Sequence, residues 1–365
     1  MSQYKRREFL KTTAGATAGA AFAGAPAVHA QTWNNQPEKG AKLRVLRWKR
    51  FVQGDEDAYM ANVKKFTAKT GIEVRVVQAE GNQLLERLKA EGEYANADVV
   101  ITVDAGNLDR LVDADLLQPA HSPTLDAVPA HFRDEQNRWF GFLKRARVIV
   151  YAKGVVDPAQ LVSMDTLATP AFKGKVCART STNLYNLSMM AARIEREGAD
   201  KALAWARGVA GNFARQPQGS DSDQLRAVAA GQCQVAIANH YYLVRFRRSE
   251  DPADRAVSEK LGVVFPDQAG PNGQGVGTHV NISGAGLATH ARNRANALQL
   301  LEFLSSTEAQ QVMSDKNNEL PVASGVTLSP ELAALGTFKE ETVNFSAFGG
   351  RQPEAQRLFD EAGWK

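Results

Sequence analysis

Strand-like and helix-like segments alternate through the first third of the chain. Residues 43–48, 72–77 and 97–103 form short apolar or alternating runs of strand length. Between them, apolar residues recur at helical spacing and each stretch stops at a glycine, Gly71 or Gly92. This alternation is typical of a parallel α/β sheet, because parallel strands need a crossover helix to connect them. We therefore expect an α/β fold.

The alternation restarts in the second half. Strand-like runs cover residues 148–151, 175–178 and 234–239, and a single helix is predicted over residues 296–313. The Gly-rich segment 273–286 suits a crossover strand or hinge, because no Gly-Lys-Ser/Thr sequence ends it as in a phosphate-binding loop. A chain of 365 residues is long enough for two domains. We expect two α/β lobes with a ligand cleft between them.

The first thirty residues have the composition of an export signal. A charged start that includes Arg6 and Arg7 precedes the Ala/Gly-rich run 12–27, and small residues lead to a predicted cleavage site after Ala30. The paired arginines are typical of a twin-arginine signal. Removal of residues 1–30 lowers the formal net charge from +4 to +1, so the composition does not indicate nucleic acid as a partner. We expect the mature protein in the periplasm.

Only two cysteines occur in the chain, Cys177 and Cys233, and each lies at the start of an apolar run. Export to an oxidising compartment permits a disulfide between them, and adjacent parallel strands would bring them into range. Two separate buried thiols that act as small hydrophobic side chains are an equal alternative. The sequence leaves both open.

Two adjacent tyrosines directly follow the strand predicted at residues 234–239. In open α/β sheets, ligands bind beyond the carboxyl ends of the strands. Successive strand residues point to opposite faces, so Tyr241 and Tyr242 reach one ligand only if the chain turns there. Polar Asn239 favours a turn into a helix. Half-buried rings with solvated hydroxyls are the alternative.

The sequence lacks the motifs of common enzyme classes. It contains no Gly-x-Ser-x-Gly elbow, no His-Glu-x-x-His, no Gly-rich nucleotide loop and no Cys/His cluster. For His240 and His279, hydrogen bonding or packing is a more typical role than general base. We expect a binding protein that is not an enzyme.

Eight runs, in order along nearly the whole mature chain, resemble the ferric-ion-binding components of bacterial ABC transporters. These runs are 66–72, 84–92, 97–104, 139–151, 179–188, 239–242, 277–284 and 362–365. The resemblance implies a two-lobed periplasmic binding protein fold, type II-like, with iron in the interlobe cleft. It also implies delivery to an inner-membrane permease, and we expect a monomer. The expected lobes are 42–138 with 277–325, and 139–276 with 326–365.

Tyrosines hold the iron in this family, and the resemblance carries that role onto Tyr185, Tyr241 and Tyr242. Ferric ion is small and hard, so it should prefer anionic oxygen to thiolate. A bound metal displaces the phenolic proton, and three phenolates balance three positive charges. Loading should therefore release protons and weaken in acid. The resemblance also implies that Arg145 lies close behind the site.

The first lobe departs from the family pattern. Lys49-Arg50-Phe51 stands where the family usually has Arg-His-Tyr, and neither phenylalanine nor arginine can ligate a metal. We expect water, a synergistic anion such as carbonate or citrate, or a displaced side chain such as Tyr59, Asp55 or Glu56 to complete the coordination of iron. The guanidinium group of Arg50 either donates hydrogen bonds to that anion or is a solvated surface charge.

The arginines support an alternative function. With Arg50, Arg145, Arg147 and Arg179 near three tyrosines, the site also suits an organic anion or a ferric chelate rather than bare iron. Each of these arginines equally suits a structural salt bridge. The sequence does not distinguish ferric from ferrous iron.

Overall fold

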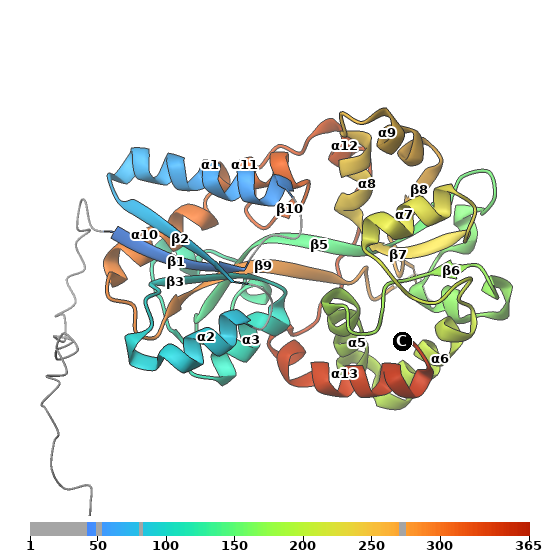
Figure 1. The fold of residues 1–365 in the computed structure, drawn as a ribbon, viewed down its shortest axis with the longest axis horizontal. Coiled ribbons are helices and arrows are strands. Elements are labelled where there is room, and N and C mark those ends of the chain that lie inside the picture. The colour runs from blue at the N-terminus through green and yellow to red at the C-terminus, as the bar shows by residue number, and fades with distance from the viewer. Residues whose placement is uncertain (1–41, 49–52, 80–82, 270–274) are drawn as a thin grey trace, which may run out of the picture. The chain divides into compact units, whose positions relative to one another are not determined.

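A computed structural model describes residues 42–48, 53–79, 83–269 and 275–365 (Figure 1). Its strands are β1 (Lys42–Trp48), β2 (Glu73–Ala79), β3 (Val99–Val103), β4 (Leu117–Gln118), β5 (Trp139–Ala152), β6 (Val176–Cys177), β7 (Val235–Asn239), β8 (Leu261–Val264), β9 (Val280–Ala288) and β10 (Leu320–Pro321). Its helices of eight or more residues are α1 (Gln53–Thr70), α2 (Gln83–Glu91), α3 (Ala105–Asp113), α5 (Leu184–Glu197), α6 (Ala199–Gly211), α7 (Asp221–Ala229), α8 (His240–Arg247), α9 (Pro252–Glu259), α10 (Arg294–Ser305), α11 (Thr307–Asn317) and α13 (Phe348–Ala362). The short α4 (Pro123–Asp126) and α12 (Pro330–Ala333) complete the α-helices of the described residues. The predicted export signal and Arg50 lie outside the described residues.

The sheet has the strand order β2-β1-β3-β9-β5-β7-β6. Strands β1, β2 and β3 are parallel, as predicted, because α1 and α2 provide the crossovers between them. Strand β9 runs antiparallel to both β3 and β5, so the Gly-rich segment does contain a crossover strand. A Cβ at Gly284 would lie 2.7 Å from the carbonyl oxygen of Phe140, which explains glycine at this crossing.

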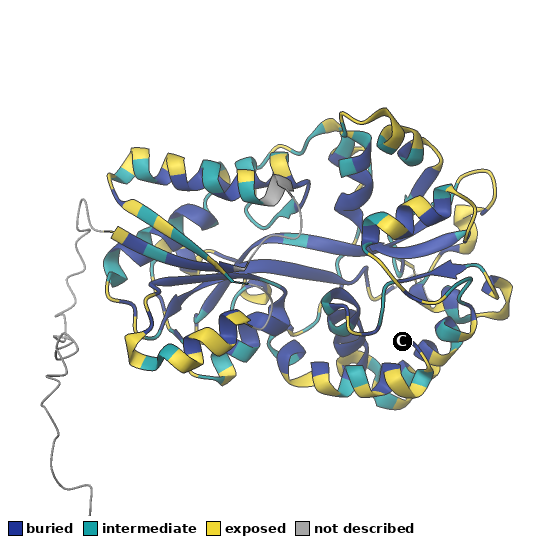
Figure 2. Ribbon diagram, in the orientation of Figure 1, coloured by how far each residue is buried: buried dark blue, intermediate teal, exposed yellow. Residues whose placement is uncertain are grey.

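Strand β5 is fourteen residues long and changes partner midway. It pairs with β9 up to Ala146 and with β7 from Arg147 onward. We call β1–β4, β9, β10 and the first half of β5 the first strand group, and β6–β8 with the second half of β5 the second strand group. Figure 1 shows β5 and β9 running through the centre of the ribbon. Both strands are almost entirely buried (Figure 2).

Two hydrophobic clusters form the core. The smaller one takes its buried residues from 149–237 and 355–364, all within the range expected for the second lobe. The larger one draws on both expected lobes, so the lobe limits stay a prediction. The region predicted as one helix over 296–313 is instead two helices, α10 and α11, and the single-helix prediction is wrong there. Ser306 has extended backbone between them and its hydroxyl accepts from the Ala309 amide, which caps α11.

Cys177 and Cys233 form a disulfide, with their Cα atoms 5.9 Å apart. Cys177 lies in β6, and Cys233 lies two residues before the start of β7. The parallel pairing of Val176 with Val235 brings the two cysteines together. The structure therefore decides between the two alternatives that the sequence left open.

Within the described ranges, no helix combines the length and the apolar composition needed to cross a membrane.

Candidate functional site

The tyrosine pair lies where a strand changes into a helix. Strand β7 ends at Asn239, which has extended backbone, and α8 begins at His240. Tyr241 and Tyr242 therefore lie in the first turn of α8 rather than on opposite faces of a strand. Tyr185 occupies the first turn of α5, where the side chain of Asn183 caps the helix by accepting from the Asn186 amide.

The structure brings the three predicted tyrosines together. The hydroxyl oxygens of Tyr185 and Tyr241 are 3.4 Å apart. The rings of Tyr241 and Tyr242 are stacked with centroids 4.5 Å apart. The Asn239 side-chain amide donates to the Tyr241 hydroxyl at 3.5 Å. Two segments separated by more than fifty residues thus converge on one place.

All three tyrosines are buried, with exposed fractions of 3–5%. Burial raises the pKa of Tyr185, Tyr241 and Tyr242 above the usual 10. Tyr241 raises the pKa of Tyr185 further, and Tyr242 raises that of Tyr241. Tyr185 raises the pKa of Tyr242, whereas the hydrogen bond with Tyr241 lowers it. The metal-free phenols are consequently protonated at neutral pH. A ligand that binds these tyrosines as phenolates must therefore displace their protons.

Arg145, which the resemblance implies lies close behind the site, contacts Tyr185. Its guanidinium carbon is 5.3 Å from the Tyr185 ring centroid. Its nitrogens donate to the Glu319 carboxylate at 2.9 Å, to the Ser283 hydroxyl at 2.9 Å and to the Ile282 carbonyl at 2.6 Å. Its charge is compensated by Glu319, and it is only 2% exposed.

Two further arginines lie near Tyr185 and share one carboxylate. Arg147 and Arg179 each lie 5.8 Å from the Tyr185 ring centroid. Both donate to Asp221, at 2.5 Å and 3.0 Å respectively. Asp221 is fully buried, so its charge is neutralised within the protein.

Sequence reasoning missed Arg245. Its guanidinium carbon lies 5.2 Å from the ring centroids of both Tyr241 and Tyr242. Unlike the three arginines near Tyr185, it has no acidic partner among the described residues, and its buried Nη1 has no hydrogen-bond acceptor there. The indication in the sequence is helical spacing, because Arg245 lies three and four residues after the tyrosine pair.

The described candidates of the expected first lobe, Glu56 and Tyr59, have contacts other than the tyrosine cluster. The side chain of Asp55, like Arg50, is not among those described. Glu56 accepts hydrogen bonds from Arg47 and Gln78. Tyr59 is buried, and Arg47 stacks on its ring at 4.6 Å. No group of three or more His, Cys, Asp or Glu side chains in the described ranges has the arrangement of a metal site.

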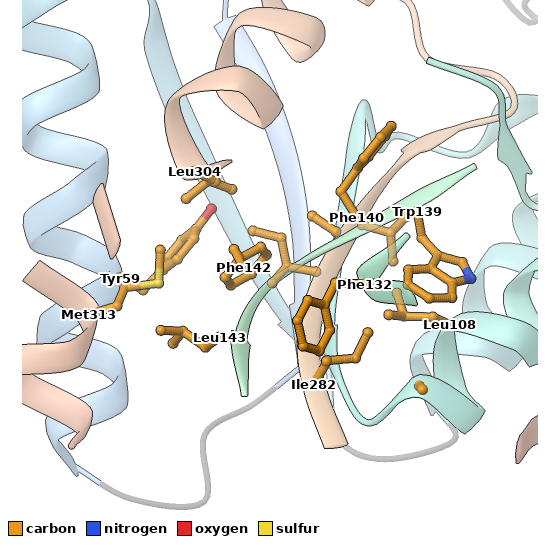
Figure 3. Packing of buried hydrophobic residues seen from close by; sticks show 14 of the residues in the cluster. Tyr59, Leu108, Phe132, Trp139, Phe140, Phe142, Leu143, Ile282, Leu304 and Met313 are labelled. Atoms are coloured by element: carbon orange, nitrogen blue, oxygen red, sulfur yellow. The ribbon is translucent and has the colours of Figure 1, made fainter. Parts of the chain in front are cut away.

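The Tyr59 ring is part of the apolar core beside the first strand group. Figure 3 shows Tyr59 near Met313 and Phe142, with its hydroxyl toward Leu304. A cavity of about 30 Å³ lies beside it, lined by Phe142, Met313 and Arg47, among others. The charged groups that affect its pKa are Arg47 and Glu56, not the other tyrosines. Burial raises the pKa of Tyr59, so its hydroxyl is also protonated.

The two histidines near the motifs are buried and hydrogen-bonded. The ring Nδ1 of His240 accepts from the Ala146 amide at 3.0 Å, and burial lowers the pKa of His240 to about 4. The Nδ1 of His279 is 3.0 Å from a carboxylate oxygen of Glu341. Both histidines fit the packing and hydrogen-bonding roles expected from the sequence.

Comparison with known proteins connects this geometry to a family. The family model for bacterial extracellular solute-binding proteins matches residues 61–340. This chain belongs to that family. Its fold is the two-lobed α/β fold of periplasmic binding proteins, as predicted.

The resemblance to ferric-iron-binding components is confirmed by relatives over most of the chain. Iron uptake protein A1 of Synechocystis sp. is 44% identical over 302 residues, which cover 82% of each chain. The major ferric iron-binding protein of Neisseria meningitidis serogroup B is 27% identical over 316 residues, which cover 85% of this chain and 91% of that protein.

Two solved structures are similar throughout. A Trichodesmium protein (FutA) in complex with iron and citrate ligands has a TM-score of 0.83 and 43% identity. The match covers 89% of this chain and all of that one. A ferric binding protein from Campylobacter jejuni has a TM-score of 0.80 and 36% identity, over 88% of this chain and all of that one.

Proposed function

We propose that this solute-binding protein captures ferric iron through the phenolate oxygens of Tyr185, Tyr241 and Tyr242. The observation that carries the proposal is the meeting of the Tyr185 and Tyr241 hydroxyls at 3.4 Å, with Tyr242 stacked on Tyr241. Three phenolates balance the charge of Fe³⁺, and hard anionic oxygen is the ligand type that such an ion prefers. The similarity to proteins named for iron uptake and ferric-iron binding supports the cargo.

The same geometry weakens the alternative of a metal-free organic anion. Arg145 and Arg179 each donate to a carboxylate of the protein itself, at 2.9 Å and 3.0 Å. An organic anion would have to compete with Glu319 and Asp221 for these guanidinium groups. The three phenols can form hydrogen bonds to an anion, but they carry no positive charge that would attract it.

A small anion completes the coordination of iron in this proposal, because the described residues bring three phenols but no fourth ligand to one place. Arg245 is the arginine available to it, since it stacks on Tyr241 and Tyr242 and its buried Nη1 has no hydrogen-bond acceptor in the described part of the chain. Carbonate or citrate suits a guanidinium fork. Similarity to a structure that holds both iron and citrate supports this choice. Tyr59, Asp55 and Glu56 stay sequence predictions as displaced ligands of iron, and Arg50 stays one as a partner of the anion.

The transport setting follows from the family and the N-terminus. We propose that residues 1–30 are a twin-arginine signal cleaved after Ala30, and that the mature monomer delivers iron to an inner-membrane permease. Extracellular solute-binding proteins serve transport, which agrees with the expectation of a non-catalytic carrier.

The test is a comparison of three ligands on the purified mature protein. Ferric salt with carbonate or citrate should give one iron per chain and a visible tyrosinate-to-iron absorption band. Citrate without iron should bind at least 100-fold more weakly. Colourless protein that binds citrate equally well without iron would overturn the proposal and establish the anion function instead.

A further inference from the structure

The guanidinium of Arg147 connects the two segments that carry the tyrosines. Arg147 is 1% exposed and lies on β5 where this strand leaves β9 and joins β7. Its Nη2 donates to Oδ1 of Asn186 at 2.7 Å, and its Nη1 approaches Oδ1 of Asn239 at 3.3 Å. One planar side chain thus bridges the starts of α5 and α8.

Both asparagines are immediate neighbours of the tyrosines. Asn186 follows Tyr185 in the first turn of α5, and Asn239 is the residue before α8, two positions ahead of Tyr241. The Asn186 side-chain amide also donates to the carbonyls of Arg179 and Thr180. The side-chain amides of Asn186 and Asn239 are therefore hydrogen-bonded through both their oxygen and their nitrogen atoms.

Asp221 accepts from Nη1 of Arg147, the same nitrogen that approaches Asn239. Its Oδ1 accepts from Arg147 and from the backbone amide of Asn239 at 3.3 Å, and its Oδ2 accepts from Arg179. All four side chains, Arg147, Asp221, Asn186 and Asn239, have exposed fractions of 2% or less. Water has little access to the bonds among these four side chains, so the protein itself fixes their geometry.

We propose that Arg147 is a positioning residue that sets the distance between Tyr185 and the Tyr241–Tyr242 pair. The inference rests on the proposed function, because the distance matters most when one metal must reach all three oxygens. Metal sites tolerate small errors of ligand placement poorly, so a loosened support costs affinity even if every ligand is present. A merely structural ion pair would instead lower stability and leave the site geometry unchanged.

The informative substitution is Arg147→Lys. Lysine keeps the positive charge opposite Asp221 but presents a single point of donation, so it cannot bond both asparagines in one plane. The matched control is Arg193→Lys. Arg193 is also buried, lies on α5 and pairs with Asp165 and Glu197, but it packs on Trp205 in the smaller hydrophobic cluster.

Both variants should lower the melting temperature by a similar amount. Only Arg147→Lys should also weaken ferric binding by ten-fold or more and shift the wavelength of the tyrosinate-to-iron band. An Arg147→Lys protein with the wild-type band and an affinity within two-fold of wild type would overturn the inference. Asn186→Ala removes the hydrogen bond between Arg147 and Asn186 and keeps the Arg147–Asp221 pair. It serves as the second variant if Arg147→Lys does not fold.

A measurement without iron separates this inference from the proposed function. Fluorine NMR of mature protein labelled with 3-fluorotyrosine reports each of the six tyrosines that follow Ala30. In the iron-free protein, Arg147→Lys should shift the resonances of Tyr185, Tyr241 and Tyr242, whereas Arg193→Lys should leave them in place. Failure of the wild type to bind iron would refute the proposed function, and unshifted resonances in Arg147→Lys would refute the positioning role.

Discussion

Buried polar side chains beside the two strand groups differ in the partners that they contact. Beside the second group, Tyr185, Tyr241 and Tyr242 contact one another, and buried Asp221 pairs with two arginines. Beside the first group, the hydroxyl of Tyr59 has no hydrogen-bond partner in the described part of the chain. Buried Asp109 accepts from the Gly349 amide but forms no ion pair there.

This contrast shows that burial does not identify a ligand site. Burial raises the pKa of Tyr59 just as it raises that of Tyr241. What differs is whether the oxygen atoms converge and whether the surrounding charges are compensated. Convergence allows one cation to replace several protons, whereas an isolated buried phenol has only an energetic cost.

The largest effect should come from removing phenolic oxygen from the tyrosine cluster. The double variant Tyr241→Phe/Tyr242→Phe should lose the visible iron band and at least 100-fold in ferric affinity, because two of three anionic ligands are gone. Tyr59→Phe is the matched control and should keep both. Absorption spectroscopy and chelator competition measure the outcome, and a double variant that stays coloured would contradict the assignment.

Ferric affinity should fall steeply in acid. Each phenol has a raised pKa and must lose its proton to bind iron, so lower pH favours the unloaded, protonated state. With up to three protons released per iron, affinity should fall between ten-fold and about a thousand-fold per pH unit. Chelator competition from pH 8 to pH 6, corrected for the chelator's own protonation, checks this. A pH-independent affinity would mean that the ligands are not phenols.

Asp109 should make stability depend on pH in the direction opposite to a salt-bridged carboxylate. Burial raises the pKa of Asp109 to about 8, so the folded state favours the protonated form. Its contribution is therefore lost as pH rises from the unfolded value toward 8, at about 1.4 kcal/mol per pH unit. The unfolding free energy of Asp109→Asn minus that of wild type should increase over this range.

Removing the disulfide should affect stability more than iron binding. The Cys177–Cys233 bond closes a loop with a sequence separation of 56 residues, which corresponds to about 4 kcal/mol of chain entropy in the unfolded state. Cys177→Ala/Cys233→Ala should unfold at lower denaturant concentration and keep the iron band. Loss of the band in a folded variant would show that the bond also positions Tyr185, which lies within the loop.

The smallest effect is expected at Tyr59. Its buried hydroxyl lacks a partner among the described residues, so Tyr59→Phe removes a desolvation cost and should stabilise the fold by up to about 1 kcal/mol. Chemical denaturation measures this change. A destabilised variant would indicate that the hydroxyl has a function in the intact protein.

Much of this arrangement was predictable from local sequence. The alternation before residue 104 predicts the parallel strands, and the step from apolar β7 to Asn239 predicts the turn that places Tyr241 and Tyr242 on a helix. Local patterns could not show which arginines have carboxylate partners, because Asp221 is 74 residues from Arg147 and Glu319 is 174 from Arg145. The break at Ser306 was missed because apolar periodicity continues across it.

Strand β5 changes its pairing partner at the tripeptide Arg145-Ala146-Arg147, and this has a mechanical consequence. Arg145 is bonded to β9 and Glu319, Arg147 is bonded to the helices of the tyrosines, and the Ala146 amide between them is bonded to His240. Bending of the backbone at Ala146 would pull directly on the first residue of α8. The hydrogen bond from the Ala146 amide to His240 therefore connects the point where β5 changes partner to the start of the helix that carries Tyr241 and Tyr242.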